Sequence, residues 1–332
     1  MKSYIKAISY YLPEYVLSNE EISAAHPEWD ANKISVKTGI FERHIASAHE
    51  FASDMAIKAA EQLFEEHEIS KTDIDFLLYC TQSPDYFLPT TACILQDRLG
   101  LQKSTGAMDF NLGCSGYVYG LAIAKGLVSA NIAKNVLLIT SDTYSKFIHE
   151  NDKSNKTIFG DGAAATVISS NNGLFEICDF SLGTDGSGYE NLIVKNGGVR
   201  YKNAVGTDQF DDAGGYLRND DYLYMNGGSI FSFTNNAVPE LVREVLSKNE
   251  TSLDEVNYFL FHQANKYMLD FIRKKMNIPQ EKFIYYLEKV GNTVSSTIPI
   301  ALKEKCVDKK HSNILLAGFG VGYSWGGCLI KS

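Results

Sequence analysis

An internal repeat constrains the fold of this 332-residue chain more than any other feature of its sequence. Segments 73–87 and 255–269 both have a polar start, a short apolar strand and a polar loop. In a second pair, a strand that runs into Gly113–Cys114 corresponds to one that runs into Gly291–Asn292. A third pair, NVLLITSD and NILLAGFG, follows in the same order, and the offsets within the pairs are 182, 178 and 178 residues. The repeat predicts two similar halves, although few residues are identical between them.

Apolar runs of strand length alternate along the chain with stretches of helical periodicity. The runs are apolar almost throughout, as buried strands are, and lie at residues 74–80, 135–142, 163–169, 256–262 and 313–319. The clearest helical pattern covers residues 52–67, with Ser53 and Asp54 as candidate N-caps. This alternation is typical of layered α/β folds.

The repeat and the alternation together predict an α/β fold of two halves, residues 1–172 and 173–332. If the halves pack about a pseudo-twofold axis, equivalent strand ends meet at the centre of the molecule. The polar, Gly-rich stretch 196–221 interrupts the second half, and we expect it to form an inserted surface loop or lid.

The composition excludes several classes of protein. A net charge of −9 and a pI near 5.3 argue against a general nucleic-acid binder, which needs a basic surface. The first residues lack the apolar core of a secretory signal, and no apolar run reaches the ~18 residues of a membrane span. The six cysteines show no C-x-x-C spacing. We therefore expect a cytoplasmic protein with reduced thiols, no membrane contact and no metal site.

Cys114 is the candidate nucleophile. It lies where an apolar strand ends at Gly113 and an apolar helix, expected over residues 117–128, begins. The positive end of that helix is expected to lower the pKa of the thiol, and Gly113 and Gly116 to leave room for a substrate at the backbone. The alternative is a buried structural cysteine, which fits the remaining five: Cys80, Cys93, Cys178, Cys306 and Cys328.

The repeat brings two further polar residues toward Cys114. His262 ends an apolar strand, at the sheet edge where α/β folds bind ligands, and Asn292 is the counterpart of Cys114 in the second half. Each has a plainer alternative, a histidine satisfied within the core and an ordinary helix cap. Of two Gly-rich motifs, residues 159–168 lack the lysine of a phosphate loop. The other, residues 318–327, has backbone N–H groups that could serve as oxyanion donors.

In this setting the chain resembles the β-ketoacyl-acyl carrier protein synthase III family of the thiolase-like superfamily. The resemblance covers essentially the full length. The motifs that carry it, in the family's order, are YLPEYVLSNEEI (11–22), VKTGIFERHIA (36–46), FLPTTACILQDRLG (87–100), the Cys114 turn, FGDGAAATVI (159–168), HQAN (262–265), VGNTVSSTIPIAL (290–302) and GFGVGYSWGG (318–327).

The resemblance implies a thiolase-like α-β-α-β-α fold and a homodimer. Cys114 would accept an acyl primer, and His262 and Asn292 would donate hydrogen bonds to an enolate formed by loss of CO₂ from malonyl-acyl carrier protein. Backbone N–H groups of Cys114 and Val321 would form the oxyanion hole. No cofactor would be bound permanently, because the substrates are thioesters of CoA or of the phosphopantetheine arm of acyl carrier protein.

Other positions are assigned by the same resemblance. The expected substrate contacts are Leu88, Met225, Gly227 and Phe231, and the expected contacts to carrier protein or CoA are Lys33, Lys37, Lys266, Lys274 and Lys275. Four positions depart from the family's pattern. Lys33 replaces a Trp that stacks on adenine, with Trp29 nearby but off register. Tyr267 replaces an arginine, Leu88 a gating aromatic and Val321 a glycine. Two versions of the reaction stay open, initiation of fatty-acid synthesis from acetyl-CoA and condensation in a specialised pathway. These departures favour the second, with a different primer such as a carrier-bound one.

Two alternatives remain at this stage. Relatives of this family also transfer acyl groups to oxygen or nitrogen without decarboxylation, which release of CO₂ would distinguish. A non-catalytic scaffold is the second alternative, and retention of Cys114, His262 and Asn292 argues against it.

Overall fold

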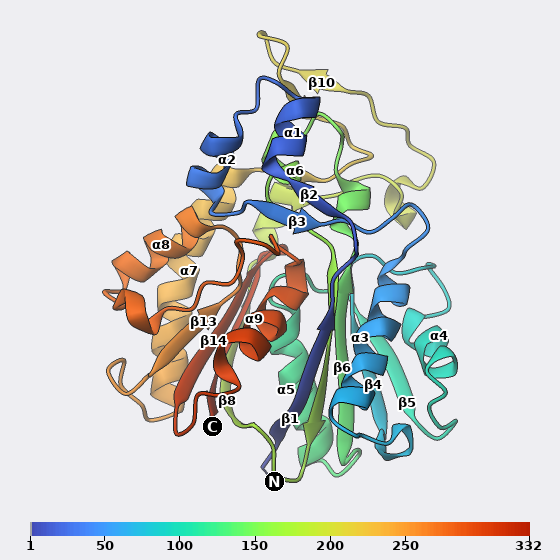
Figure 1. The fold of residues 1–332 in the computed structure, drawn as a ribbon, viewed down its shortest axis with the longest axis vertical. Coiled ribbons are helices and arrows are strands. Elements are labelled where there is room, and N and C mark those ends of the chain that lie inside the picture. Colours follow the sequence, from blue (N-terminus) through green and yellow to red (C-terminus); the bar gives the residue numbers. More distant parts are fainter. Residues whose placement is uncertain (1) are drawn as a thin grey trace.

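The structure, a computed structural model, describes residues 2–332. Its first half contains β1 (Tyr4–Tyr11), α3 (Ala52–Glu66), β4 (Phe76–Cys80), α4 (Thr91–Arg98), β5 (Gly106–Phe110), α5 (Gly116–Ser129), β6 (Asn135–Asp142) and β7 (Gly162–Ser169). The second half contains β8 (Phe175–Thr184), α7 (Gly227–Lys248), β13 (Tyr258–Phe261), α8 (Lys266–Lys275), α9 (Thr297–Cys306), β14 (Asn313–Gly320) and β15 (Ser324–Lys331). Figure 1 shows β1 and β8 side by side near the middle, with the strands of each half on either side.

Within the described residues the main sheet has nine strands, in the order β13-β14-β15-β8-β1-β7-β6-β4-β5. Its two arms repeat each other's pairing. β4 runs parallel to β6 and pairs Phe76 with Val136, and β13 runs parallel to β14 and pairs Tyr258 with Ile314. These pairs are related by the same offsets that relate the repeats in the sequence. β5 corresponds to a single parallel bridge between Phe259 and Phe283, so one arm is shorter.

Helices pack on the sheet in three layers. The central layer is formed by α5 and α9, and their side chains share a buried cluster with strand residues of both halves, such as Leu138 of β6 and Leu316 of β14. The outer layers are α3 and α4 on the first half and α7 and α8 on the second. This confirms the layered α/β fold predicted from the sequence. Within the sheet, the two arms are joined where Tyr4 and Ile5 of β1 pair with β8.

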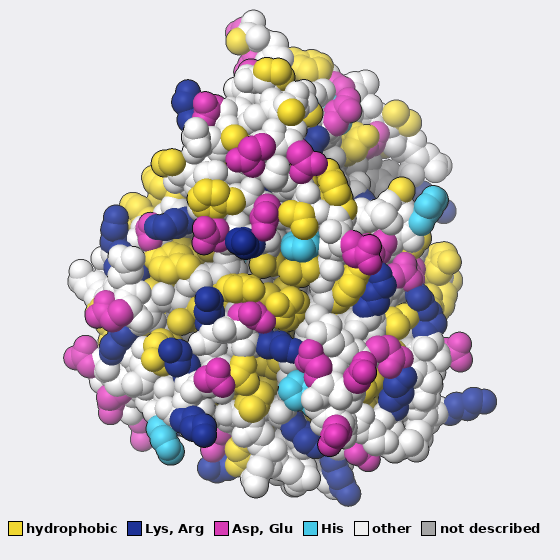
Figure 2. Space-filling model, viewed as in Figure 1, with side chains coloured by type: hydrophobic (Ala, Val, Ile, Leu, Met, Phe, Trp, Pro, Cys, Tyr) yellow, Lys and Arg dark blue, Asp and Glu magenta, His cyan; other side chains and the backbone are white. Residues whose placement is uncertain are grey.

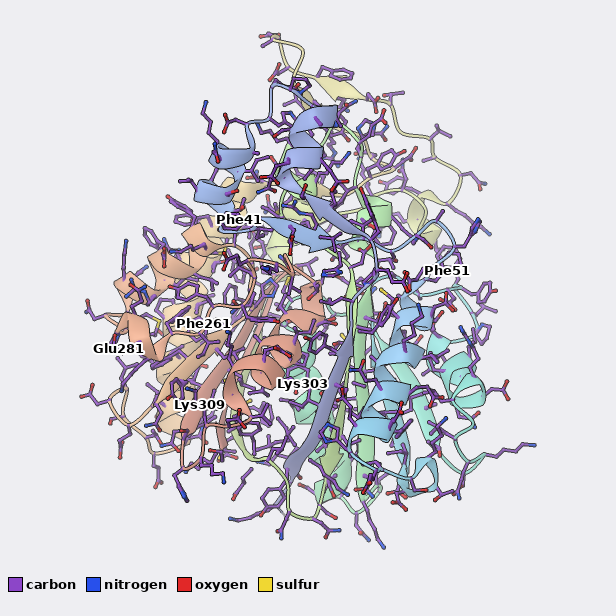
Figure 3. The ribbon with its side chains drawn as sticks, viewed as in Figure 1. Phe41, Phe51, Phe261, Glu281, Lys303 and Lys309 are labelled. Carbon is purple, nitrogen blue, oxygen red and sulfur yellow. The ribbon has the colours of Figure 1, made fainter. Side chains whose placement is uncertain are left out.

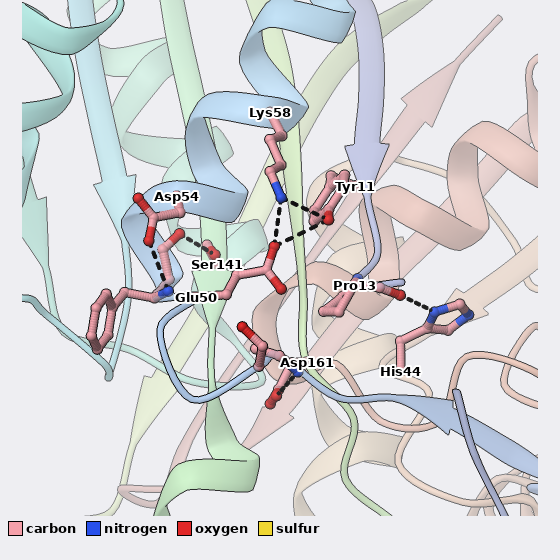
Figure 4. A network of polar contacts seen from close by, with 12 residues as sticks. Tyr11, Pro13, His44, Glu50, Asp54, Lys58, Ser141 and Asp161 are labelled. Atoms are coloured by element: carbon pink, nitrogen blue, oxygen red, sulfur yellow. Dashed lines mark hydrogen bonds and ion pairs between the residues drawn. The ribbon is translucent and has the colours of Figure 1, made fainter. Parts of the chain in front are cut away.

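The start of α3 differs from the prediction. The helix begins at Ala52, so Phe51 occupies the N-cap position, and Ser53 and Asp54 lie inside the first turn. The carboxylate of Asp54 accepts a hydrogen bond from the backbone N–H of Phe51 at 2.9 Å, and the Ser141 hydroxyl donates to the carbonyl of Ala52 at 2.8 Å (Figure 4). The prediction is therefore wrong for Ser53, whereas the Asp54 side chain does cap the helix, from the third position of its first turn. Ser141 adds a contact from a remote strand.

A cap covers the upper end of the sheet in Figure 1. Its short elements are β2 (Val16–Ser18), α1 (Asn19–Ala25), α2 (Ala31–Thr38), β3 (Glu42–His44), α6 (Lys153–Lys156), β9 (Leu192–Ile193), β10 (Gln209–Phe210), β11 (Tyr216–Arg218) and β12 (Tyr224–Met225). The stretch 196–221 belongs to this cap and carries the hairpin of β10 and β11. The buried ring of His149 anchors it by stacking on Tyr216, with ring centroids 4.4 Å apart.

Lysine and arginine side chains are interspersed with aspartates and glutamates over the face shown in Figure 2. In the part of the chain that the structure describes, no helix is long and apolar enough to cross a membrane.

Candidate active site

Cys114 lies in the turn between β5 and α5, pressed against β14 of the other half. A Cβ atom added at Gly318 would come within 2.6 Å of the Cys114 carbonyl oxygen, and one at Gly320 within 2.8 Å of its sulfur. Because real Cβ atoms do not approach so closely, the two glycines allow β14 to lie directly beside the cysteine. The thiol is largely buried but lines a cavity.

Gly113 and Gly116 have a different role from the one predicted. A Cβ at Gly113 would collide with the side chains of Gln82 and Val321, and one at Gly116 would lie 2.3 Å from the sulfur of Cys80. These glycines therefore make room for neighbouring protein side chains rather than for substrate. The turn is packed from behind, which holds the thiol of Cys114 toward the cavity.

The environment of the thiol also differs from the prediction. Burial and the nearby charge of Asp142 raise the pKa of Cys114 to about 12, whereas the backbone N–H groups of Cys114 and Val321 lower it by hydrogen bonding to the sulfur. The expected lowering of this pKa is therefore wrong for the closed cavity, because desolvation outweighs the favourable dipoles. Burial therefore keeps the thiol protonated at neutral pH.

Val321 keeps a conformation that a valine can adopt. It is not among the described residues with positive φ, and the left-handed position in this turn falls on Gly322, at φ 135°. The replacement of glycine by Val321 thus leaves its N–H directed at the Cys114 sulfur.

His262 follows directly after Phe261 of β13, which is labelled in Figure 3 among the side chains of the second half. Its backbone N–H donates to Ala317 of β14 at 2.8 Å, and ring nitrogen Nδ1 lies 2.8 Å from the hydroxyl oxygen of Thr297. The side chain is buried, and this burial lowers the pKa of His262 to about 3. The imidazole is therefore neutral at physiological pH.

Asn292 reaches the same cavity from the second half. Its backbone N–H donates to Ile158 at 2.9 Å, and its side-chain oxygen Oδ1 accepts from the N–H of Val294 at 2.9 Å. With Oδ1 engaged inside the protein, the amide group Nδ2 is the end of the side chain that remains for the cavity.

Val294 organises both polar side chains and was not singled out from the sequence. Its φ of 56° lies in the left-handed region, which costs a β-branched residue roughly 1–3 kcal/mol. In this conformation its N–H donates to Asn292, and its carbonyl accepts from the Thr297 hydroxyl at 3.1 Å. No local sequence signal marks a valine for such a conformation.

Asp142 is a second residue that sequence reasoning missed. It ends β6, is 1% exposed, and its carboxylate accepts hydrogen bonds from the N–H of Gln82 at 2.7 Å and the hydroxyl of Ser295 at 3.0 Å. Burial raises the pKa of Asp142 to about 7, and these hydrogen bonds act in the opposite direction. The carboxyl thus ties the strand beside Cys114 to the turn that follows Asn292.

The cavity has a volume of about 560 Å³. Of the predicted residues it is lined by Cys114, His262, Asn292, Lys33, Lys37, Met225, Gly227 and Phe231. Its mouth lies in the cap, where the exposed Lys33 and Lys37 of α2 are joined by Lys153 of α6. Lys153 was not predicted, and it comes from a segment remote in sequence from the other two. A positively charged entrance leads to an apolar interior.

Trp29 cannot take the place of a stacking aromatic at this entrance. It is 5% exposed, packs against Ile22 and Ile34, and has its ring covered by His26 with centroids 4.0 Å apart. The His26 ring covers one face of Trp29 within the cap, so Trp29 does not present a stacking surface at this entrance.

The other predicted contacts lie outside the cavity of this single chain. Leu88 is 82% exposed beside the edge strand β5, and Lys266 pairs with Asp270 at 2.5 Å. Lys274 and Lys275 are exposed in the last turn of α8, where they extend a basic end of that helix. Among residues 2–332 there is no cluster of three potential metal ligands.

Comparisons with known proteins find relatives of this chain in one enzyme family. Two family models match, the C-terminal part of 3-oxoacyl-[acyl-carrier-protein (ACP)] synthase III over residues 246–332 and 3-oxoacyl-[acyl-carrier-protein (ACP)] synthase III over residues 108–186. A β-ketoacyl-[acyl-carrier-protein] synthase III from Clostridium perfringens is 36% identical over 327 residues, which is 97% of this chain and 96% of the relative.

Solved structures agree. A 3-oxoacyl-(acyl-carrier-protein) synthase III superimposes with a TM-score of 0.96 at 46% identity, with 100% of both chains covered. The priming β-ketosynthase of the R1128 polyketide pathway superimposes with a TM-score of 0.87 at 25% identity, over 99% of this chain and 96% of its own.

Proposed function

This chain belongs to the 3-oxoacyl-[acyl-carrier-protein] synthase III family of condensing acyltransferases, and on that premise we propose how its cavity performs the reaction. The family condenses an acyl primer with malonyl-acyl carrier protein to begin a fatty-acid chain. The observation that carries our assignment of residues is that the buried residues Cys114, His262 and Asn292 all line the same cavity.

In the first step the sulfur of Cys114 attacks the thioester carbonyl of the primer. A carbon–sulfur bond forms to the enzyme, the bond to the departing thiol breaks, and the thiol proton leaves with that group. The N–H groups of Cys114 and Val321, which already face the sulfur, donate to the oxyanion. These donors offset the cost of ionising a buried thiol, because the negative charge moves onto an oxygen that they hold.

In the second step malonyl thioester loses CO₂, and the electron pair of the broken bond becomes an enolate. The enolate carbon attacks the acyl carbonyl, the carbon–sulfur bond to Cys114 breaks, and the released thiolate takes up a proton from solvent. For His262 to donate at Nε2, the Thr297 hydroxyl turns from the Val294 carbonyl and donates to Nδ1 of the neutral imidazole. Asn292 supplies the second donor, at Nδ2. Because the pKa of His262 is near 3, it acts as a hydrogen-bond donor and not as a proton acceptor.

We also propose that two copies associate through β5. It is the edge strand of the sheet, and its Asp109 accepts hydrogen bonds at 2.6 Å from the N–H groups of Thr91 and Ala92 at the start of α4. This linkage holds the exposed side chains of Tyr86, Phe87 and Leu88 near the edge. In a dimer Leu88 would close the acyl end of the partner's cavity, and the basic end of α8 would receive the acidic carrier protein.

Measurement of product and CO₂ tests the proposed reaction. Enzyme, acyl primer and malonyl-acyl carrier protein should release one CO₂ for each 3-oxoacyl-acyl carrier protein formed, identified by mass. His262→Ala and Asn292→Ala should still be acylated by primer while losing CO₂ release. Acyl transfer to an oxygen or nitrogen acceptor without CO₂ would overturn the proposal.

A further inference from the structure

Thr234 places an unpartnered hydroxyl in the wall of the cavity. Its side chain is 1% exposed and lines the cavity, yet its Oγ1 makes no hydrogen bond to any group of residues 2–332. An unsatisfied buried hydroxyl costs about 1–3 kcal/mol, so such groups are rare unless something else supplies a partner.

Two other threonines that line the cavity donate their hydroxyl protons to backbone carbonyls, whereas Thr234 does not. The hydroxyl of Thr38 donates to the carbonyl of Ile34, and that of Thr157 to the carbonyl of Lys153, both at 2.8 Å. Each bond runs back four residues, the usual way a helical threonine satisfies itself. Thr234 lies inside α7 with the carbonyl of Ile230 at the same position, but its hydroxyl makes no such bond.

The position of Thr234 along α7 places it in the inner part of the cavity. Gly227, Ile230, Phe231 and Thr234 follow the spacing of one helix face and all line the cavity. Gly227 is exposed and Phe231 half-buried, whereas Ile230 is 8% and Thr234 1% exposed. Thr234, almost one turn beyond Phe231, is therefore the most buried of the four residues.

We propose that Thr234 donates a hydrogen bond to the amide carbonyl of the phosphopantetheine arm that lies nearest the thioester. This rests on the proposed function, because it requires thioester substrates in this cavity. Two methylene groups separate that amide from the thioester sulfur, so it enters the buried region whenever the thioester reaches Cys114. An amide carbonyl that crosses an apolar wall needs a donor, and the arm is common to primer and malonyl substrate.

The test compares two acetyl donors that differ in the amide. Acetyl N-acetylcysteamine carries the inner amide of the arm, whereas S-propyl thioacetate lacks any amide. The rate of acylation is followed by intact mass for wild type, Thr234→Val and Thr234→Ser. Valine should slow acylation by the amide donor about tenfold and leave the propyl donor unchanged, while serine should restore the wild-type rate.

Three outcomes separate the possibilities. Equal losses with both donors, or no loss with either, would overturn the role of Thr234 while leaving the acyl-enzyme intact. Absence of acylation in wild type would instead overturn the proposed function.

Thermal unfolding gives an independent check. Thr234→Val should unfold at or above the wild-type midpoint, because it removes a buried hydroxyl that has no internal partner. A midpoint lower by several degrees would show that the hydroxyl is satisfied within the protein, and would overturn the proposal.

Discussion

The two halves of the molecule place different residues at equivalent positions around the cavity. Where β4 ends in Cys80, β13 is followed by His262, and the turn that carries Cys114 in the first half carries Asn292 in the second. β6 ends in Asp142, whereas β14 ends in Gly320. The first half thus supplies the nucleophile Cys114 and the buried carboxyl of Asp142. The second half supplies the neutral donors His262 and Asn292, and a glycine, Gly320, in place of the carboxyl. The chemistry comes from the differences between the copies, because their shared geometry only brings them together.

The largest expected effect comes from changing the donor in the second half. Asn292→Asp keeps the oxygen that accepts from Val294 but replaces the donating amide with a carboxylate oxygen. Condensation should fall by about 10²–10³, because a transition-state donor is lost, while acylation of Cys114 changes little. Rapid-quench kinetics of the two half-reactions measures this split. Equal losses in both would show that Asn292 does not act specifically on the enolate.

Adding a side chain at Gly320 of the second half should displace Cys114 of the first half. Gly320→Ala places a Cβ 2.8 Å from the sulfur of Cys114, and crowding of this kind costs about 1–3 kcal/mol of folding free energy. Urea unfolding measures the cost, and acylation should slow as the cysteine is displaced. Gly126→Ala is the control, because among the described residues nothing lies within 4 Å of the added atom and helix propensity favours alanine. Wild-type stability in Gly320→Ala would contradict the close packing of the halves.

The buried titrating groups of the two halves should give opposite pH dependences of stability. The pKa of His262 is lowered from 6.5 to about 3, so its contribution is present above pH 6.5 and is lost as the pH falls from there toward 3. The pKa of Asp142 is raised from 3.8 to about 7, so its contribution is present below pH 3.8 and is lost as the pH rises toward 7. In wild type the two slopes oppose each other between about pH 4 and 6.5.

Removing one group should reveal the slope of the other. Between pH 6.5 and 5, the free energy of unfolding of Asp142→Asn should fall by about 2 kcal/mol relative to wild type. Over the same range that of His262→Gln should rise by a similar amount. Urea titrations at both pH values measure the differences. Identical slopes in wild type and both variants would show that neither group titrates anomalously.

The sequence indicated the layered fold because long apolar runs and the repeat are local patterns. The same repeat related Cys114 to Asn292 and suggested that His262 lies near them. What it could not indicate depends on contacts between remote segments. The pKa of Cys114 is raised mainly by burial. Trp29 is buried against Ile22, so its ring is not exposed at the cavity entrance.

Two further features have the same origin. The Ser141 hydroxyl contacts the start of α3 from a remote strand. The left-handed Val294 is stabilised by its hydrogen bond to the Asn292 side chain. Neither contact is visible in the local sequence. The division into halves at residues 172–173, the homodimer and the cytoplasmic location stay predictions.

Mapping the acyl group tests the central claim that Cys114 carries the primer. Enzyme incubated with an acyl thioester is quenched in acid, digested and analysed by peptide mass spectrometry, with Cys80→Ala as the matched control for a buried neighbouring thiol. We expect one acyl group on the peptide that contains Cys114 in wild type and in Cys80→Ala, and none in Cys114→Ala. Stoichiometric, turnover-competent acylation of Cys114→Ala, or of any other residue in wild type, would contradict the account.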